Sequence, residues 1–217
     1  MERGCSLPWP IPEAEGLRRR LLAAYAEPGR RYHDQRHLAE VLARIEELRA
    51  AGETFDYPSV VLAAWFHDAI YDGADGAEER SALWAEQGLT EAGVPIDRTA
   101  EVARLVRMTA HHKPEPGDVN GGALSDADLA ILAADETRYA EYVAAVRAEY
   151  AAVPDARFDR ARLAVLQDLE RKPHLFQTSH ARTNWEHAAR TNLAKERASR
   201  GAPAGSPRED NVSGHDI

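Results

Sequence analysis

Cysteine is almost absent from the sequence. Cys5 is the single cysteine among 217 residues, and without a second one no internal disulfide can form, which is typical of proteins from reducing compartments. Long apolar runs are missing too: the longest, Val60 to Phe66, is far shorter than the roughly 18 residues that a membrane span needs. The N-terminus also lacks the continuous apolar stretch of a secretory signal. We therefore expect a cytoplasmic protein with no membrane partner.

Basic charge is scarce relative to acidic charge. The chain has 27 Lys and Arg residues against 36 Asp and Glu residues, a formal net charge of −9. Non-specific binding to nucleic acids or anionic membranes relies on basic surface, so no nucleic-acid polymer is expected as a partner. An internal repeat and a glycine-rich phosphate loop are also lacking. The composition, 44% hydrophobic and 29% charged, is that of a globular protein, and the length suits one domain.

Alternating apolar and polar residues, the pattern of a β-strand, are missing as well. Nearly every periodic segment has the helical period, which predicts an all-α domain of about seven or eight helices over residues 1–200. Two helices are clearest: residues 35–50, capped by Asp34, and the strongly apolar residues 59–72, which we expect at the centre. Residues 201–217 are small, polar and rich in Pro and Gly, which predicts a disordered tail. The other expected helical segments cover residues 13–25, 77–92, 95–112, 125–135, 136–152, 156–171 and 184–199, of which 125–135 and 136–152 are contiguous.

Ionisable residues interrupt the most apolar segment. His67 and Asp68 stand at the end of the predicted central helix, where an unpaired buried charge would cost several kcal/mol, and a divalent cation is one partner that removes this cost. An isolated pair of this kind is more often solvent-facing, but His37 lies on the preceding amphipathic helix and Asp128 begins a later apolar stripe. Imidazole and carboxylate ligands together suit Mn, Fe, Co, Ni or Zn rather than Ca.

The order of these residues carries a family resemblance. His37, the pair His67-Asp68, and Asp128, each on a predicted helix, resemble the H…HD…D signature of the HD-domain superfamily of metal-dependent phosphohydrolases. The segments RRYHDQRH, AAWFHDAIYD, EERSA, SDADLAIL and AARTNLAKE resemble a bacterial subfamily described as predicted metal-dependent HD phosphohydrolases. The resemblance spans roughly residues 25–197. It implies an HD-domain-like helical fold and one divalent transition metal (Mn, Co, Ni, Fe or Zn) held by His37, His67, Asp68 and Asp128.

A second aspartate competes for the last ligand position. Asp126 and Asp128 are two residues apart on a predicted helix and point to opposite sides, so only one can face the metal. We prefer Asp128, because the residues ADL around it match the segment that carries the last metal ligand in the superfamily. Asp126 suits a helix cap equally well.

Several further residues are candidates for binding substrate. His33 lies four residues before His37 and can share its helix face, where it would orient His37, contact a phosphate or lie at the surface. Arg36 and Lys113 are basic residues close to the motifs, and such side chains suit phosphate oxygens. His111 and His112 are adjacent, so only one is expected to reach the centre.

Other residues are candidates for proton transfer. Of the adjacent histidines we favour His112, as a phosphate ligand or proton donor, although cations at helix ends are also favoured by the helix dipole alone. Glu79 is a candidate general base that would reach a metal-activated water, with Glu78 and Asp72 as rivals. Asp68 is the ligand best placed to accept or align the proton of that water.

The resemblance implies a metal-dependent phosphohydrolase. Such an enzyme cleaves a phosphomonoester or phosphodiester of a nucleotide or small phosphorylated metabolite by attack of a metal-activated water. Two alternatives remain. An HD-fold di-iron oxygenase would need more ligands than the four named, and a non-catalytic module that binds metal or nucleotide would regulate without turnover.

Overall fold

The most apolar helix is the centre of the fold. The computed structural model describes residues 7–201, and in it α3 (Tyr57–Phe66) has Pro58 in its first turn, where a missing amide hydrogen costs nothing. Every residue from Ser59 to Phe66 is buried. A helix that is apolar all round must be covered on every side, and four helices surround it: α2 (Gln35–Ala50), α4 (Ala77–Glu91), α5 (Ile96–Thr109) and α6 (Val119–Leu129).

The prediction of a single all-α domain is confirmed. Residues 7–201 form ten α-helices and two short 3₁₀-helices, and no strand occurs among them. The predicted tail, residues 201–217, lies outside the described residues apart from the last helical residue. The remaining elements are η1 (Pro12–Ala14), α1 (Glu15–Ala24), η2 (Ala130–Ala133), α7 (Glu136–Glu149), α8 (Asp155–Arg171), α9 (Ser179–Asn184) and α10 (Glu186–Gly201).

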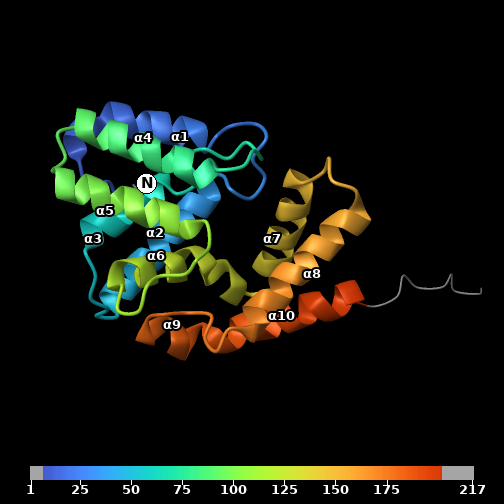
Figure 1. The fold of residues 1–217 in the computed structure, drawn as a ribbon. Coiled ribbons are helices and arrows are strands. Elements are labelled where there is room, and N and C mark those ends of the chain that lie inside the picture. The colour runs from blue at the N-terminus through green and yellow to red at the C-terminus, as the bar shows by residue number, and fades with distance from the viewer. Residues whose placement is uncertain (1–6, 202–217) are drawn as a thin grey trace, which may run out of the picture.

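The helices form a bundle and a hairpin that stand side by side. Figure 1 shows α1 to α6 gathered on one side, with α7 and α8 as an antiparallel pair on the other and α9 and α10 running beneath. α10 contacts both α8 and η2, so it connects the hairpin to the bundle. Among the described helices, none combines the length and apolarity that crossing a membrane requires.

The central helix is shorter than its apolar pattern predicts. It was expected to continue to Asp72, but α3 ends at Phe66. The buried guanidinium of Arg30 donates to the carbonyl oxygens of Asp68 (2.6 Å) and Ala69 (2.9 Å) in the turn that follows. These carbonyl groups therefore have partners without a further helical turn, and the chain can leave the helix where the sequence pattern alone predicts that it goes on.

The helix that carries Asp128 begins earlier than predicted. Residues 113–122, KPEPGDVNGG, lie between the expected helices 95–112 and 125–135, yet α6 begins at Val119 inside this segment. The Asp118 carboxylate caps the helix by accepting the amide of Gly121 at 2.9 Å. A Cβ atom on Gly121 would lie 2.3 Å from the Asp118 carboxylate, so glycine here allows a close approach rather than breaking the helix.

A buried ion pair joins α8 to α10. The guanidinium of Arg162 donates to both carboxylate oxygens of Glu196 at 2.9 Å each and to the hydroxyl of Tyr142 at 2.9 Å. The Tyr139 hydroxyl donates to the same carboxylate at 2.7 Å. The side chains of Arg162 and Glu196 are only 10% and 4% exposed, so the charge of Arg162 depends on Glu196 for compensation. Glu196 also accepts from Arg200 on its own helix at 2.9 Å.

Replacing Glu196 by Ala is expected to lower the free energy of unfolding by about 3–5 kcal/mol, because the buried charge of Arg162 loses its partner. The matched control is Lys195→Ala on the same helix, whose exposed pair with Glu136 is worth at most about 1 kcal/mol. Urea denaturation followed by circular dichroism measures both variants. A loss in Glu196→Ala no larger than in the control would contradict a stabilising role for this pair.

Candidate metal centre

Three separate elements position the four residues of the H…HD…D pattern. His37 lies in the first turn of α2, which begins where the Asp34 carboxylate accepts the amide of His37 at 3.1 Å. His67 and Asp68 form the turn directly after α3, and Asp128 lies near the end of α6. Because α2 and α6 both pack on α3, these three places meet at one point inside the bundle.

The side chains of these residues converge closely. The Nε2 atoms of His37 and His67 lie 3.1 Å apart. Oδ2 of Asp68 lies 3.3 Å from Nε2 of His37 and 3.0 Å from Nε2 of His67. Oδ1 of Asp128 lies 3.2 Å and 3.6 Å from the same two nitrogens. The two imidazoles are almost fully buried, at 2% and 1% exposed, whereas the carboxylates are 17% and 13% exposed.

This arrangement suits a metal ion. His37, His67 and Asp128 form a group that can bind one, since they bring their ligand atoms within 4.8 Å of one another. Two ligand atoms that each lie about 2.1 Å from a metal, with their two bonds to it at a right angle, are about 3.0 Å apart. The nitrogen–oxygen distances observed here, 3.0 Å to 3.6 Å, are close to this value. Nδ1 of His67 donates to the carbonyl oxygen of Ala64 at 2.8 Å, which leaves the Nε2 lone pair directed at the centre of the group.

The charges of the group depend on one another. Burial by itself lowers the pKa of His37, but the carboxylates of Asp128 and Asp68 outweigh it and raise that pKa to about 9. Burial by itself raises the pKa of Asp128, but His67 and His37 hold it well below its ordinary value. Without a metal, the protonated imidazoles therefore supply the positive charge that stabilises the carboxylates. A bound divalent metal would replace these protons as the source of positive charge.

Arg30 connects the two segments that carry the histidines. Its side chain is 1% exposed, and besides the carbonyl groups after α3 it donates to the carbonyl oxygen of His33 at 2.9 Å. The loop before α2 is thereby held against the turn after α3. Arg30 is the first residue of the RRYHDQRH segment, but no local sequence pattern shows which backbone groups its side chain reaches.

The structure separates the two competing aspartates. Asp128 joins the histidines, whereas Asp126 is fully buried on another side of α6. The Asp126 carboxylate accepts the backbone amides of Gln177 and Thr178, each at 2.7 Å, so it holds the segment before α9 instead of capping its own helix. Burial raises the pKa of Asp126 to about 6 although these amides act in the opposite direction.

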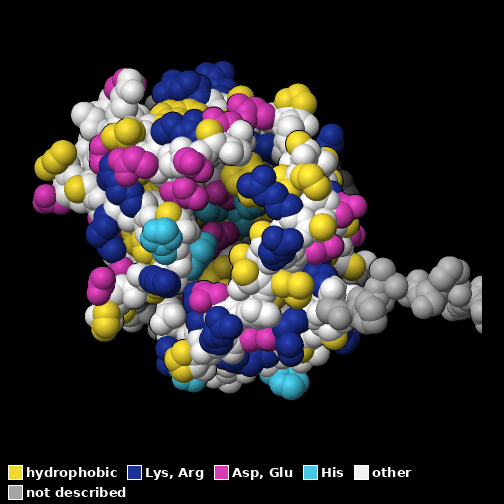
Figure 2. Space-filling model, turned by 45° about the vertical axis from the view of Figure 1, so that its right-hand side comes forward, with side chains coloured by type: hydrophobic (Ala, Val, Ile, Leu, Met, Phe, Trp, Pro, Cys, Tyr) yellow, Lys and Arg dark blue, Asp and Glu magenta, His cyan; other side chains and the backbone are white. Residues whose placement is uncertain are grey.

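A cleft of about 720 Å³ opens onto the group, with Asp68 and Asp128 in its lining. Figure 2 shows this face of the molecule hollowed, with histidine and acidic side chains deep inside and Lys or Arg side chains around the mouth. One wall follows the turn after α3 and the end of α5. The opposite wall comes from α7, α8 and the residues that directly follow them. Its apolar part is Val146, Tyr150, Ala164, Val165 and Leu169, and the charged residues Arg162, Asp168 and Lys172 also line it.

Besides Asp68, three of the predicted substrate or catalytic residues line this cleft. They are His33, His112 and Lys113, and the competing residue His111 lines it as well. His112 adopts a left-handed backbone conformation with φ of 47°, which is uncommon for a residue with a Cβ atom. Its Nε2 atom lies 3.4 Å from Oδ2 of Asp128 and its Nδ1 atom 3.3 Å from the Ser125 hydroxyl. His112 thus contacts the metal-binding group, whereas His111 is exposed.

Two predicted residues do not line the cleft. Arg36 is exposed and donates to Glu40 at 3.1 Å and to Glu141 at 2.8 Å. Both carboxylate oxygens of Glu79 accept from Arg107 at 2.7 Å.

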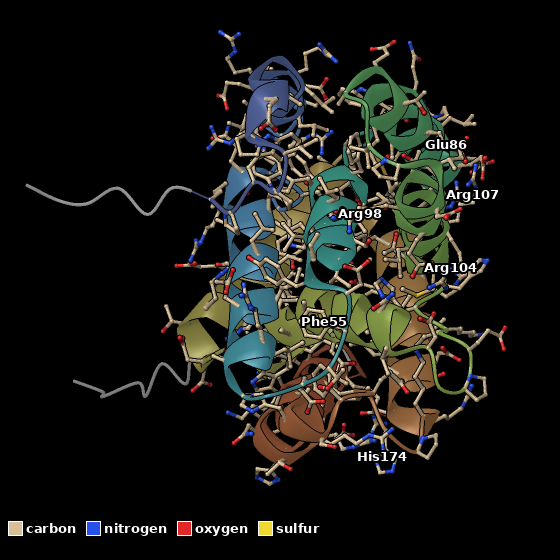
Figure 3. The ribbon with its side chains drawn as sticks, turned by 90° about the vertical axis from the view of Figure 1, so that its left-hand side faces the viewer. Phe55, Glu86, Arg98, Arg104, Arg107 and His174 are labelled. Atoms are coloured by element: carbon tan, nitrogen blue, oxygen red, sulfur yellow. The ribbon has the colours of Figure 1, made fainter. Side chains whose placement is uncertain are left out.

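Arg107 also bonds Glu86, and Figure 3 shows these two side chains next to each other on the surface of α4 and α5. Of the residues that rivalled Glu79, Asp72 pairs with Arg80 at 2.6 Å, and Glu78 lines the cleft.

Sequence reasoning missed the residues that α7 and α8 contribute. Arg162 and Lys172 line the cleft, and Glu149 accepts a hydrogen bond from His33 across 116 residues of sequence. None of these residues belongs to a short motif, and each becomes a neighbour of the metal-binding group only when the hairpin packs beside the bundle.

No family model, curated protein or solved structure matches the sequence. The resemblance to the HD-domain superfamily therefore rests on the motifs alone and stays a prediction. The structure adds that the four residues of the motif pattern lie together in space and that two of them, Asp68 and Asp128, line a cleft.

Replacing Asp68 by Ala is expected to lower the affinity for Mn, Co or Zn by at least 10-fold. Mutation of a residue that merely orients a metal ligand already lowers metal affinity by about 10–100-fold, and loss of a ligand itself should lower it at least as much. His187→Ala, an exposed histidine on α10, should bind metal like the unchanged protein. Equilibrium dialysis with elemental analysis measures the bound metal per chain. Full occupancy in Asp68→Ala would overturn its assignment as a ligand.

Proposed function

We propose that the protein hydrolyses phosphate esters of small molecules with one divalent transition metal bound by His37, His67, Asp68 and Asp128. The observation that supports this proposal is the convergence of two buried imidazoles with two carboxylates that line an open cleft. A purely structural metal site is closed by its ligands, whereas a catalytic site keeps positions for water and substrate. Here both carboxylates line the cleft.

The metal would supply the acidity that the protein side chains lack. A divalent transition metal lowers the pKa of a bound water from about 15.7 toward 7 and polarises a phosphoryl oxygen. Asp68 contacts both imidazoles through Oδ2, and we assign its other oxygen to accept the proton of the attacking water. His112, 3.4 Å from Oδ2 of Asp128, orients that carboxylate.

The cations of the cleft favour an anionic substrate. The chain contains only three lysines, and two of them, Lys113 and Lys172, line the cleft. Within residues 7–201 neither forms an ion pair with a carboxylate, so both ammonium groups are available to bind phosphate oxygens. The apolar wall from α7 and α8 provides a surface for the carbon skeleton of the substrate.

Hydrolysis is tested with a panel of nucleoside monophosphates, sugar phosphates and cyclic dinucleotides, each with added Mn, Co, Ni, Fe or Zn. We expect metal-dependent release of phosphate or of a ring-opened product, lost after chelation and in His67→Ala. The assay is colorimetric phosphate detection with chromatography for the cyclic compounds. If metal binds but no member of the panel is cleaved, the proposed hydrolysis is wrong.

Lys113→Gln and Lys172→Gln are each expected to raise KM about 10-fold with little change in kcat, because a charge-assisted contact to the substrate is worth about 1.5–3 kcal/mol and such a contact is made in ground and transition state alike. Lys195→Gln, whose side chain pairs with Glu136 on α7, is the matched control. Initial-rate kinetics on the best substrate of the panel measure both constants. An unchanged KM in both cleft variants would exclude these lysines from binding.

A further inference from the structure

Glu149, the last residue of α7, holds the segment that carries His33. Its side chain is 3% exposed. Oε1 accepts the backbone amides of Arg31, Tyr32 and His33 at 2.9, 2.8 and 2.9 Å, and Oε2 lies 2.7 Å from Nδ1 of the His33 ring. One carboxylate therefore binds three consecutive amides and the imidazole that follows them.

The proton between His33 and Glu149 has a defined donor. Burial by itself raises the pKa of Glu149, but the His33 hydrogen bond and the backbone amides lower it to about 2. The carboxylate is therefore ionised and can only accept, so Nδ1 of His33 is the donor.

The position of the ring directs its second nitrogen to the cleft. His33 stacks on Tyr71 with ring centroids 4.0 Å apart and an angle of 25° between the planes, and it meets Tyr32 edge to face. His33 lines the cleft whereas Glu149 does not. Because Nδ1 faces the buried carboxylate, Nε2 is the nitrogen presented to a substrate. Among the described residues, none forms a hydrogen bond with this Nε2 atom.

We propose that His33 donates the proton to the leaving oxygen of the substrate through Nε2, and that Glu149 is the positioning residue that fixes the ring for this transfer. The inference rests on the proposed hydrolysis. It assigns to His33 the proton transfer that the sequence favoured for His112, because both ring nitrogens of His112 have neighbours, the Ser125 hydroxyl and the Asp128 carboxylate.

The proposed step exchanges one bond at phosphorus and moves two protons. The oxygen of water forms the new bond to phosphorus and gives its proton to Asp68. The bond between phosphorus and the leaving oxygen breaks with both electrons on that oxygen, which takes the Nε2 proton of His33. Asp68 then releases a proton to solvent and His33 takes one up, so that both residues return to their starting states.

A general acid matters most for a poor leaving group, because an oxygen that departs as a stable anion needs no proton. The test therefore compares two aryl-containing esters of similar size, benzyl phosphate and 4-nitrophenyl phosphate, with Mn or Co added. His33→Asn keeps a donor for the Glu149 carboxylate and removes the second nitrogen. Glu149→Gln keeps an oxygen for the three amides and removes the charge.

We expect His33→Asn to lower kcat for benzyl phosphate by about 100-fold or more, within the range of general acid catalysis, and for 4-nitrophenyl phosphate by less than about 10-fold. Glu149→Gln should show the same selectivity with a smaller loss. Glu141→Gln, an exposed glutamate on the same helix, should change neither rate. Equal losses on both esters would overturn the proton-transfer role and leave the proposed hydrolysis intact.

A second readout does not depend on turnover. Long-range ¹⁵N–¹H NMR of the full chain reports whether each ring nitrogen of His33 carries a proton. We expect protons on both, Nδ1 for the Glu149 carboxylate and Nε2 for the leaving oxygen. In Glu149→Gln the side-chain amide donates to Nδ1 instead, so the Nδ1 proton should be lost. An unprotonated Nδ1 in the unchanged protein, or no change in the variant, would refute the positioning role of Glu149. If the unchanged protein cleaves neither ester while its NMR result holds, the proposed hydrolysis is the part that fails.

Discussion

Ionisable groups at the centre of an apolar bundle are the constraint on which the rest of this structure depends. Two imidazoles and two carboxylates meet beside α3, the most deeply buried helix, and charges in such surroundings are tolerated only when they compensate one another. Helices α2, α3 and α6 must therefore pack in one register, since a shift of any one would leave a buried charge without its partner. The same register creates the place where a metal can bind.

The α7–α8 hairpin turns this buried group into a site that a substrate can reach. It supplies the apolar wall of the cleft, and through Glu149 it also holds the loop that carries His33. Its position depends in turn on the buried pair between Arg162 and Glu196. Packing between α8 and α10 thus supports the position of the His33 ring, because the hairpin carries the Glu149 carboxylate that binds the ring.

The helical pattern was most informative inside the helices and least informative at their ends. The bounds of α2, Gln35–Ala50, agree with the apolar stripe and the Asp34 cap, because both are local features. The end of α3 was predicted too late, since Arg30 binds the carbonyl groups of the next turn. The start of α6 was also predicted too late, since Gly121 there serves close packing against the Asp118 cap. In both cases a side-chain contact outweighed the local signal.

From the sequence alone came the all-α class and the apolar central helix, because helical periodicity acts on neighbouring residues. The set of His37, His67, Asp68 and Asp128 was predicted from the resemblance of the motifs to the HD-domain superfamily. Tertiary structure alone decided that Asp128 and not Asp126 joins the histidines, that Arg36 and Glu79 lie in surface ion pairs, and that Glu149 supports His33. These outcomes depend on which helix faces meet, and the packing that sets them involves residues more than a hundred positions apart.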